Sequence, residues 1–215
     1  MSVDEMLEDI IHENDSWNDL FNNKMKEKLE GILSKIANTS YQPTGKAIFN
    51  VFKMPISKIK VVILGQDPYP TQGYAMGYAF AVPADKKIPK SLSAIKKEIN
   101  NDEDPKWQTL KHWRDSGVFL LNTALTVEKN KPGSHLAFWK DFTKEVIKFI
   151  SKTHPCIWML WGRKAQKFKN VIKESNKKNH ILEAPHPARG NGFHKCGRKN
   201  FLDANKILGK DEIRW

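Results

Sequence analysis

Four short apolar segments, each followed at once by glycine, proline or polar residues, constrain the fold of this chain most strongly. They read KVVILG, VFLLN, CIWMLWG and HILEAP, at residues 60–65, 118–122, 156–162 and 180–185. Runs of this length without polar alternation are typical of strands buried on both faces of a parallel sheet. Helical patterns at residues 91–99, 138–150, 165–174 and 201–208 alternate with them. The sequence therefore predicts an α/β fold, a three-layer α/β/α sandwich with a central four-stranded parallel sheet.

The N-terminal region has a helical pattern of its own. Apolar residues recur at helical spacing between residues 17 and 37, and an earlier short helix is expected at residues 5–12. No internal repeat and no linker rich in glycine, serine or proline divides the sequence. We expect a single domain over residues 1–215, with the helices of residues 1–43 packed on it.

The charge balance indicates the class of partner. With 36 Lys and Arg against 24 Asp and Glu, the net charge is +12, which favours a polyanion such as nucleic acid. The apolar runs are only strand-length, so we expect no membrane association. The opening residues MSVDEMLEDI have neither the basic start nor the apolar segment of a secretory signal. We expect an intracellular protein: cytoplasmic if bacterial, nuclear or in a viral factory if eukaryotic or viral.

The cysteine content excludes several kinds of site. Only Cys156 and Cys196 occur. Two cysteines cannot build a disulfide framework, nor a metal or iron–sulfur site with four cysteine ligands. We expect both to be free thiols and the protein to hold no metal.

The ends of the four predicted strands carry the unusual polar residues. Ligands of open parallel sheets bind outside the carboxyl ends of the strands. Here those ends lead into residues 66–70 (Gln-Asp-Pro-Tyr-Pro), Asn122, Gly162-Arg163 and His186. Each residue alone has an ordinary explanation, such as a turn carboxylate for Asp67 or a surface histidine for His186. Their coincidence at one sheet edge predicts a functional site.

These motifs also carry a resemblance. GQDPYP, then Gly-Tyr-Ala-Phe at residues 77–80, LLNTALTV, LWGRKAQ and APHP resemble, in order and spacing, the motifs of the inhibitor-sensitive uracil-DNA glycosylase family. The similarity runs from Thr44 to the C-terminus. It implies a monofunctional hydrolase that frees uracil from single- or double-stranded DNA in base excision repair, with no metal or organic cofactor. It further implies a monomer and acidic DNA-mimicking inhibitor proteins as partners.

The resemblance gives Asp67 and His186 the catalytic roles. Breaking the N-glycosidic bond develops positive charge on the sugar and negative charge on the departing base. Asp67 resembles the family carboxylate that orients the attacking water and faces the cationic sugar. His186 resembles the histidine that donates a hydrogen bond to uracil O2 as negative charge builds there.

Four further residues resemble the family's uracil-binding set. Asn122 can accept from N3–H and donate to O4, which matches uracil and mismatches cytosine. Tyr69 corresponds to the ring placed against C5, where thymine carries a methyl group. Phe80 corresponds to the ring that stacks on the flipped base, although its position alone would suggest a core aromatic. Gln66 corresponds to a residue that contributes mainly backbone contacts.

The DNA-binding residues implied by the resemblance fall in three segments. Lys90 and Ser91 end a proline-containing loop expected to press on the strand, with Ser91 donating to a phosphate. Gly162 and Arg163 stand where the family usually has Gly-Ser, at a helix start suited to anions. The third segment follows His186 and contains Ala188, Arg189 and Phe193.

Two motifs depart from the family pattern. Pro70 replaces the usual histidine, so one side-chain contact is missing. After His186-Pro187, the usual Ser-Pro-Leu gives way to residues 188–193, Ala-Arg-Gly-Asn-Gly-Phe, and the leucine that wedges into the emptied base stack is absent. Arg189 is the favoured replacement wedge because a guanidinium stacks on bases. Phe193 is the competing wedge, or else an anchor of the loop.

Both departures resemble the poxvirus branch, whose member also serves as a polymerase processivity subunit. This leaves an alternative function, a DNA-binding replication accessory with dispensable catalysis. Retention of Asp67, Asn122 and His186, with Tyr69 and Phe80, favours the enzyme. A thymine-mismatch or iron–sulfur glycosylase is disfavoured by Tyr69 and by the two cysteines.

Overall fold

The four predicted strands form one parallel sheet in the order β3-β2-β5-β6. Their bounds are β2 (Val61–Gly65), β3 (Val118–Asn122), β5 (Ile157–Trp161) and β6 (His180–Ala184). The computed structural model describes residues 1–13, 15–99, 104–189 and 191–215. Of residues 12, 13, 15, 189, 191 and 195 it describes the backbone alone. The predicted α/β fold with a four-stranded parallel sheet is confirmed.

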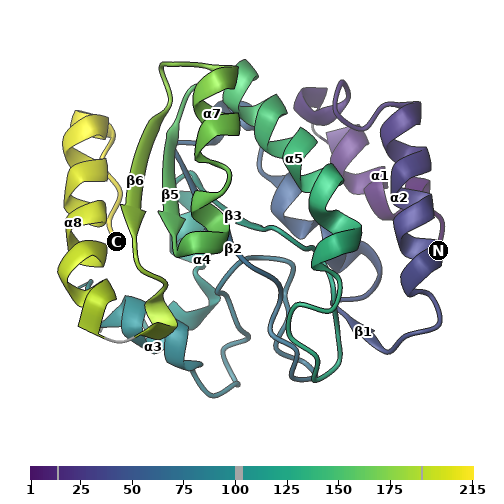
Figure 1. Cartoon of the computed structure of the whole chain (residues 1–215), viewed down its shortest axis with the longest axis horizontal. Coiled ribbons are helices and arrows are strands. Elements are labelled where there is room, and N and C mark those ends of the chain that lie inside the picture. Colours follow the sequence, from purple (N-terminus) through teal and green to yellow (C-terminus); the bar gives the residue numbers. More distant parts are fainter. Residues whose placement is uncertain (14, 100–103, 190) are drawn as a thin grey trace.

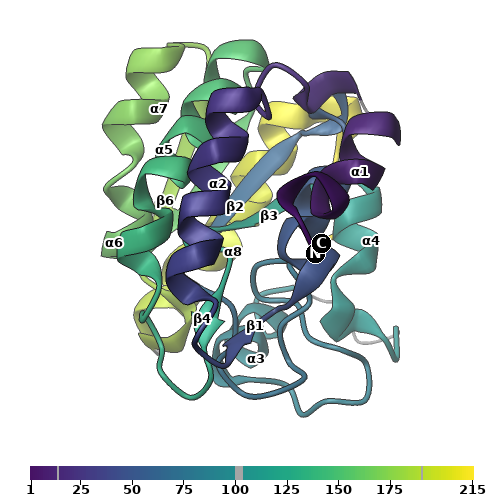
Figure 2. The same ribbon diagram turned by 90° about the vertical axis from the view of Figure 1, so that its right-hand side faces the viewer.

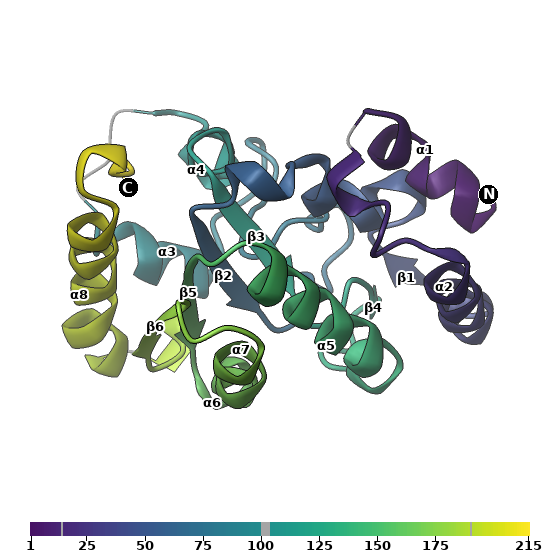
Figure 3. The same cartoon turned by 90° about the horizontal axis from the view of Figure 1, so that it is seen from above.

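Helices cover both faces of this sheet (Figure 3). Alternate strand residues point to opposite faces. Val62, Phe119 and Trp158 thus join one hydrophobic cluster, and their neighbours Val61, Val118 and Ile157 join the other. The first cluster is covered by α5 (Leu136–Thr153) and α7 (Lys169–Ser175), which follows the short α6 (Arg163–Gln166). The second is covered by α3 (Lys90–Lys96), α4 (Lys111–Asp115) and α8 (Asn191–Leu208).

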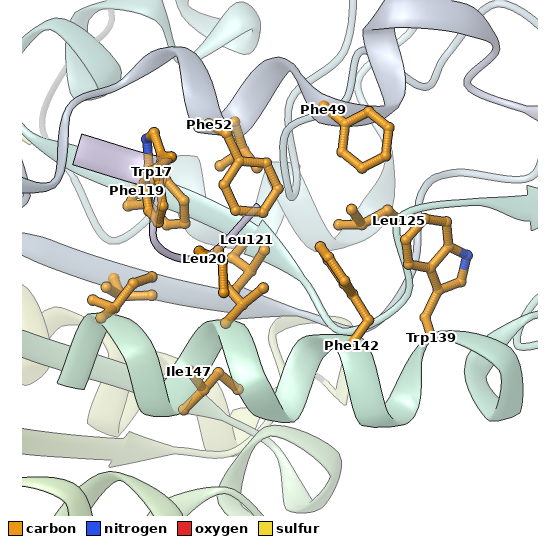
Figure 4. Close-up of a cluster of buried hydrophobic side chains, with 14 of the residues drawn as sticks. Trp17, Leu20, Phe49, Phe52, Phe119, Leu121, Leu125, Trp139, Phe142 and Ile147 are labelled. Carbon is orange, nitrogen blue, oxygen red and sulfur yellow. The ribbon is translucent and has the colours of Figure 1, made fainter. Parts of the chain in front are cut away.

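The N-terminal helices add their buried side chains to the first hydrophobic cluster. These are α1 (Val3–Glu13) and α2 (Asn23–Ile36), which stand in front of the sheet in Figure 2. Between them and α5 lies a group of aromatic rings (Figure 4) that includes Trp17, Phe52, Phe119 and Phe142. Large aromatic side chains bury much apolar area each, so this group ties the N-terminal segment to the sheet.

The remaining regular segments are short. Two two-residue strands, β1 (Tyr41–Gln42) and β4 (Val127–Glu128), pair with each other in antiparallel fashion. The 3-10 helices span Asp15–Trp17, Gly45–Lys53, Ile56–Lys58, Trp107–Thr109, Pro187–Arg189 and Gly209–Asp211. No helix among the described residues is long and apolar enough to cross a membrane.

Three helix predictions need correction. The helix expected at residues 17–37 begins only at Asn23, because the Asn22 side chain accepts a hydrogen bond from the Met25 N–H and caps it there. The helix expected at 165–174 is divided into α6 and α7. The last helix begins at Asn191, well before residue 201. Its N-terminal half was not predicted because the glycines at 192 and 197 have low helix propensity.

The fourth strand also differs from the prediction of full burial. In β6, His180 and Glu183 are exposed and Ala184 alone is buried. β6 has a neighbouring strand only in β5, but β3 at the opposite edge is buried throughout, so edge position alone does not set the exposure.

Candidate active site

The strand order creates a crevice at the carboxyl edge of the sheet. From β2 the chain proceeds to β3 on one side, whereas from β5 it proceeds to β6 on the other. The segments that follow β2 and β5 therefore diverge, which is where open α/β sheets bind ligands. A cleft of about 810 Å³ lies at this point. Its lining includes Gly65, Gln66, Gly162, Arg163, His186 and Ala188. In Figure 1 the strand arrows point toward this edge, near α3.

Asp67 stands just beyond the end of β2 and has a fixed orientation. Its Oδ1 accepts a hydrogen bond from Gln66 Nε2 at 2.9 Å, and its Oδ2 accepts one from the Gly133 N–H. Each carboxylate oxygen has a second lone pair, so the group retains acceptor capacity for a water molecule. The two bonds hold the carboxylate while leaving it able to orient another donor.

Burial raises the pKa of Asp67 above its ordinary value. Desolvation is the largest influence, because it penalises the charged form. The Gly133 and Gln66 hydrogen bonds and the positive charge of Lys164 act in the opposite direction and lower the pKa. The carboxylate is therefore partly withdrawn from solvent without losing its stabilising donors.

The segment after β2 is joined to the segment after β3. The Gln66 carbonyl accepts bonds from Thr123 Oγ1 at 2.7 Å and from the Ala124 N–H at 2.9 Å. The Thr123 N–H donates to the Gly65 carbonyl at 3.0 Å. These bonds fix Asp67 relative to Asn122, which precedes Thr123.

Asn122 is buried, with 5% of its surface exposed, and its Oδ1 has no hydrogen-bond partner in the described structure. Leaving a buried amide oxygen unpaired costs about 1–3 kcal/mol. An amide oxygen that has no protein partner is able to accept a hydrogen bond from a ligand donor.

Tyr69 faces α3 and the Phe80 backbone. Its hydroxyl is bonded to Ser91 Oγ at 3.0 Å and donates to the Phe80 carbonyl at 3.3 Å. Burial raises the pKa of Tyr69 to about 12, so the phenol is neutral. These contacts hold the ring rigidly beside Phe80.

Phe80 has a backbone conformation that sequence analysis did not foresee. Its φ is 65°, in the left-handed region that non-glycine residues rarely occupy. Such strain persists where surrounding structure enforces it, frequently at functional sites. The Phe80 ring centroid lies 5.7 Å from that of Trp161 and 6.3 Å from that of His186. Phe80 and His186, from segments far apart in the sequence, are thus neighbours.

One hydrogen bond of His186 indicates which of its nitrogens serves as a donor when the ring is neutral. Its Nδ1 accepts a hydrogen bond from the Ala188 N–H at 3.1 Å. A neutral imidazole carries one proton, so this bond places the proton on Nε2. The backbone at Gly162 passes close to His186. A Cβ at position 162 would lie 2.8 Å from His186 Cβ, so only glycine permits this approach without a shift.

The expected DNA-binding residues fall into different surroundings. Lys90, Arg163 and Ala188 are exposed, as a DNA contact requires. Ser91 is buried and its hydroxyl is bonded to Tyr69 rather than presented to solvent. The side chain of Arg189 lies outside the described part of the structure.

Phe193 is not placed to touch DNA. It is fully buried in α8, and its ring packs on Trp161 with centroids 5.2 Å apart. Gly197, one turn later, leaves room for the ring, since a Cβ there would lie 2.6 Å from Phe193 Cζ. The expected DNA contact and wedge role for Phe193 is corrected accordingly: it anchors the start of α8.

Two residues of this region were missed by sequence analysis. The Gly133 N–H donates a hydrogen bond to the Asp67 carboxylate. The Gln42 side chain donates to backbone carbonyls in the segment that follows Asp67. Residues 131–134, Lys-Pro-Gly-Ser, have the composition of a turn, but nothing in their local pattern indicates an approach to Asp67. Among the described residues, no group of three or more His, Cys, Asp or Glu side chains is placed to hold a metal ion.

Comparison with known proteins identifies the family of this chain. Residues 52–209 match the family model of the uracil DNA glycosylase superfamily. A uracil-DNA glycosylase of Borreliella burgdorferi is 42% identical over 214 residues, covering 91% of this chain and 93% of that protein. One from Campylobacter jejuni subsp. doylei is 39% identical over 224 residues, covering 96% and 95%.

Solved structures to which this chain is similar include uracil-DNA glycosylases as well. The crystal structure of mimivirus uracil-DNA glycosylase superposes with a TM-score of 0.75 at 28% identity, covering 98% of this chain and 86% of that one. A variant of mimivirus UNG, solved in complex with UGI, gives a TM-score of 0.78 at 28% identity, covering 93% and 87%.

Proposed function

This chain belongs to the uracil DNA glycosylase superfamily, and from that premise we propose how its residues release uracil from DNA. The reaction is hydrolysis of the N-glycosidic bond of a flipped-out deoxyuridine, which yields free uracil and an abasic site in base excision repair. The enzyme is a monofunctional hydrolase, as its uracil-DNA glycosylase relatives indicate. Lys164 lines the cleft, and we assign it an electrostatic role toward Asp67 rather than Schiff-base formation. The observation that carries the residue assignment is the convergence of Asp67, Asn122 and His186 on one sheet edge.

Asp67 acts on the sugar side of the scissile bond. Its ionised carboxylate accepts a hydrogen bond from the water that attacks C1′ and faces the cationic sugar of the transition state. The bonds from Gln66 and Gly133 support this role, since they hold the carboxylate without occupying all its lone pairs. As C1′–O forms, the C1′–N1 bond breaks and its electron pair leaves with uracil, while the proton that the attacking water loses passes to the Asp67 carboxylate.

His186 acts on the departing base. A neutral ring with its proton on Nε2 donates a hydrogen bond to uracil O2 as negative charge accumulates there. The Ala188 N–H supports this assignment because it occupies Nδ1. Positioned donors of this kind are worth about 2.7–4 kcal/mol of transition-state stabilisation.

The uracil pocket is formed by Asn122, Tyr69, Phe80 and Gln66. Asn122 pairs with N3–H and O4, which fits its buried, unpartnered Oδ1. Tyr69 blocks the C5 methyl of thymine, with its ring held by Ser91 and the Phe80 carbonyl. Phe80 stacks on the base and Gln66 contributes backbone contacts.

DNA is held around this pocket by exposed groups at the same edge. Lys90 and Arg163 attract phosphates, and the backbone of Gly162 and Ala188 allows close approach of the strand. Ser91 supports Tyr69 and contacts a phosphate when its hydroxyl turns toward the strand. Arg189 is the wedge that fills the space left by the flipped base.

The wider assignments follow from this activity. The substrate is uracil-containing DNA, single- or double-stranded, and the enzyme acts as a monomer inside the cell, where DNA is found. Residues 1–215 form a single domain, supported by the core that α1 and α2 share with the sheet. The mimivirus complex with UGI supports an acidic, DNA-mimicking inhibitor as a further partner. The alternative, a replication accessory with dispensable catalysis, rests on the motif departures at Pro70 and residues 188–193, whereas the curated relatives are named uracil-DNA glycosylases, which favours the enzyme.

One assay tests the proposal directly. The purified protein is incubated with matched oligonucleotides containing uracil, a thymine-guanine mismatch or only normal pairs, with chelator present, and abasic sites are measured. Abasic sites should form only at uracil, and Asp67→Asn and His186→Leu should each lower turnover about 100-fold or more with DNA affinity kept. Wild-type turnover in both variants contradicts the assigned mechanism.

Selectivity is tested by two further variants in the same assay. Tyr69→Ala should admit some thymine release, and Asn122→Asp should weaken discrimination against cytosine. Unchanged selectivity in both variants would contradict the pocket roles of Tyr69 and Asn122. It would not affect the catalytic roles assigned to Asp67 and His186.

A further inference from the structure

Gln42, at the end of β1, holds the backbone of the segment that follows Asp67. Its Nε2 donates to the carbonyls of Tyr69 and Thr71, both at 2.7 Å. Its Oε1 accepts a bond from the Gly73 N–H at 3.3 Å. An amide group has two donor hydrogens, so both are committed to this one segment.

The segment needs such a partner because of its own composition. Pro68 and Pro70 have no N–H, and Gly73 has a φ of 78°, so the chain from 68 to 73 cannot enter a regular hydrogen-bonded ladder. Backbone carbonyls that are not paired with backbone must find a side chain or water. Gln42 supplies a side-chain donor to two of them.

Gln42 is itself held by a small ribbon. β1 pairs with β4, opposing Gln42 to Val127, and the Lys129 N–H donates to the Ser40 carbonyl at 2.7 Å. Figure 2 shows β1 and β4 together at the end of the molecule where α3 lies. The ribbon therefore gives Gln42 a fixed base.

The loop after β4 supports the same segment at three more points, one of which is a bond from Lys129 Nζ to Gln72 Oε1 at 2.7 Å. The Asn130 N–H donates to the Pro70 carbonyl at 3.0 Å, and the Gly133 N–H donates to the Asp67 carboxylate. The β1–β4 ribbon and its loop thus bind the catalytic segment before, at and after Tyr69.

We infer that Gln42 is a positioning residue for uracil release: it fixes the Asp67–Gly73 segment, and through it the Asp67 carboxylate and the Tyr69 ring. This inference rests on the proposed roles of Asp67 and Tyr69. The Gln42 amide is bonded to the backbone of Tyr69, Thr71 and Gly73, so we assign it no direct part in the chemistry. A displacement of about 1 Å in a catalytic group can cost about 100-fold in rate, so loss of these bonds affects turnover more than binding.

Two variants of Gln42 test the inference. Gln42→Met preserves length without hydrogen bonds, and Gln42→Glu places an acceptor against two carbonyl oxygens. We expect kcat to fall about 10- to 100-fold in both, with KM for uracil-DNA within about threefold of the wild-type value. The matched control is Asn176→Ala, which lies outside this segment: among the described residues its side chain accepts one exposed hydrogen bond, from the Lys178 N–H at 3.0 Å, and activity should stay within about twofold.

A double-mutant cycle separates positioning from a general structural role. If Gln42 acts through Asp67, then Gln42→Met in an Asp67→Asn background should add less than about threefold to the loss. Thermal melting and circular dichroism establish that every variant is folded at the assay temperature. If Gln42→Met destabilises the fold, Gln42→Glu serves in the same cycle.

The outcomes distinguish this inference from the proposed function. A fully multiplicative loss in the double variant, or wild-type kcat in both folded Gln42 variants, overturns the positioning role while Asp67 keeps its own. Wild-type turnover in Asp67→Asn alone instead overturns the catalytic assignment on which the inference rests.

Discussion

Gly65 and Asn122 lie opposite each other on neighbouring strands, and a Cβ on Gly65 would overlap the Oδ1 atom of Asn122. The same Cβ would lie 2.8 Å from the Ala79 side chain. Gly65 therefore keeps its side-chain space empty so that Asn122 can occupy it. The position of the Asn122 amide, to which we assign base reading, therefore depends on the absence of a side chain at Gly65.

Gly65→Ala should accordingly displace Asn122 and lower uracil release by about 100-fold, because the methyl group has no space on either side. Gly31→Ala is the matched control: Gly31 lies in α2, and a Cβ there meets nothing within 4 Å. This change should leave activity unaltered and stabilise the protein by about 0.5–1 kcal/mol. Turnover on uracil-DNA and thermal melting measure both effects. Full activity in Gly65→Ala would mean that Asn122 does not need its present position.

The pH dependence of turnover should report Asp67. Its pKa is raised by burial, and the ionised form is the active one, so activity is lost as pH falls through a midpoint above the ordinary value of 3.8. Lys164→Ala removes a positive charge that lowers this pKa and should move the acid limb to still higher pH. The measurement is kcat/KM on a uracil oligonucleotide across acidic and neutral pH. A limb that does not move in Lys164→Ala contradicts this electrostatic coupling.

The titration of Asp67 should also change the stability of the fold. Activity is lost as pH falls, whereas the stability contribution of Asp67 is lost as pH rises. A carboxyl group whose pKa is higher in the folded than in the unfolded state contributes stability while protonated, and this contribution is lost as pH rises through the folded pKa. Asp67→Asn cannot titrate, so its melting temperature relative to the wild type should increase from acidic to neutral pH. A constant difference across that range would show that folding does not shift this pKa.

Asn179 should matter for stability and not for catalysis. It is buried, and its Oδ1 accepts from the Cys156 N–H and Trp158 Nε1, while its Nδ2 donates to the Ser151 and Asn176 carbonyls. Asn179→Ala leaves these groups without partners and should cost about 2–4 kcal/mol of unfolding free energy.

The control for this prediction is Asn176→Ala. Its side chain makes one exposed bond, to the Lys178 N–H, so the cost should remain below about 1 kcal/mol. Denaturant titration gives both values, and uracil release by folded Asn179→Ala should match the wild type. Equal costs in the two variants would contradict the importance of the buried network.

Substitutions of Arg189 and Phe193 should have different effects on uracil release from duplex and from single-stranded DNA. Arg189→Ala should impair release from duplex DNA far more than from single strands, where less stacking must be overcome. Phe193→Ala should instead cost about 3–5 kcal/mol of stability, as expected for a buried ring, and leave the duplex-to-single-strand ratio unchanged. Equal loss on both substrates for Arg189→Ala would reduce Arg189 to a phosphate contact.

Much of the fold could be predicted from local pattern. The apolar runs ending at Gly65, Asn122 and Trp161 are long enough and apolar enough to be buried strands, and the intervening helices follow from 3.6-residue spacing. Helix boundaries were less accurate. The start of α8 at Asn191 was missed because Gly197 is required by the Phe193 ring, which is a tertiary contact.

By itself, then, the sequence determined the class of fold, the sheet edge at which the site lies and the identity of the polar residues there. These depend on hydrophobic periodicity and on the rule that parallel strands present their carboxyl ends together. Only the tertiary structure decided which residues hold that site. Gln42 reaches Tyr69 across 27 positions and Gly133 reaches Asp67 across 66, separations that no local pattern encodes. The burial that raises the pKa of Asp67 and the positive φ of Phe80 likewise arise only when distant segments close around them, because desolvation and strain belong to the assembled surroundings and not to the residue.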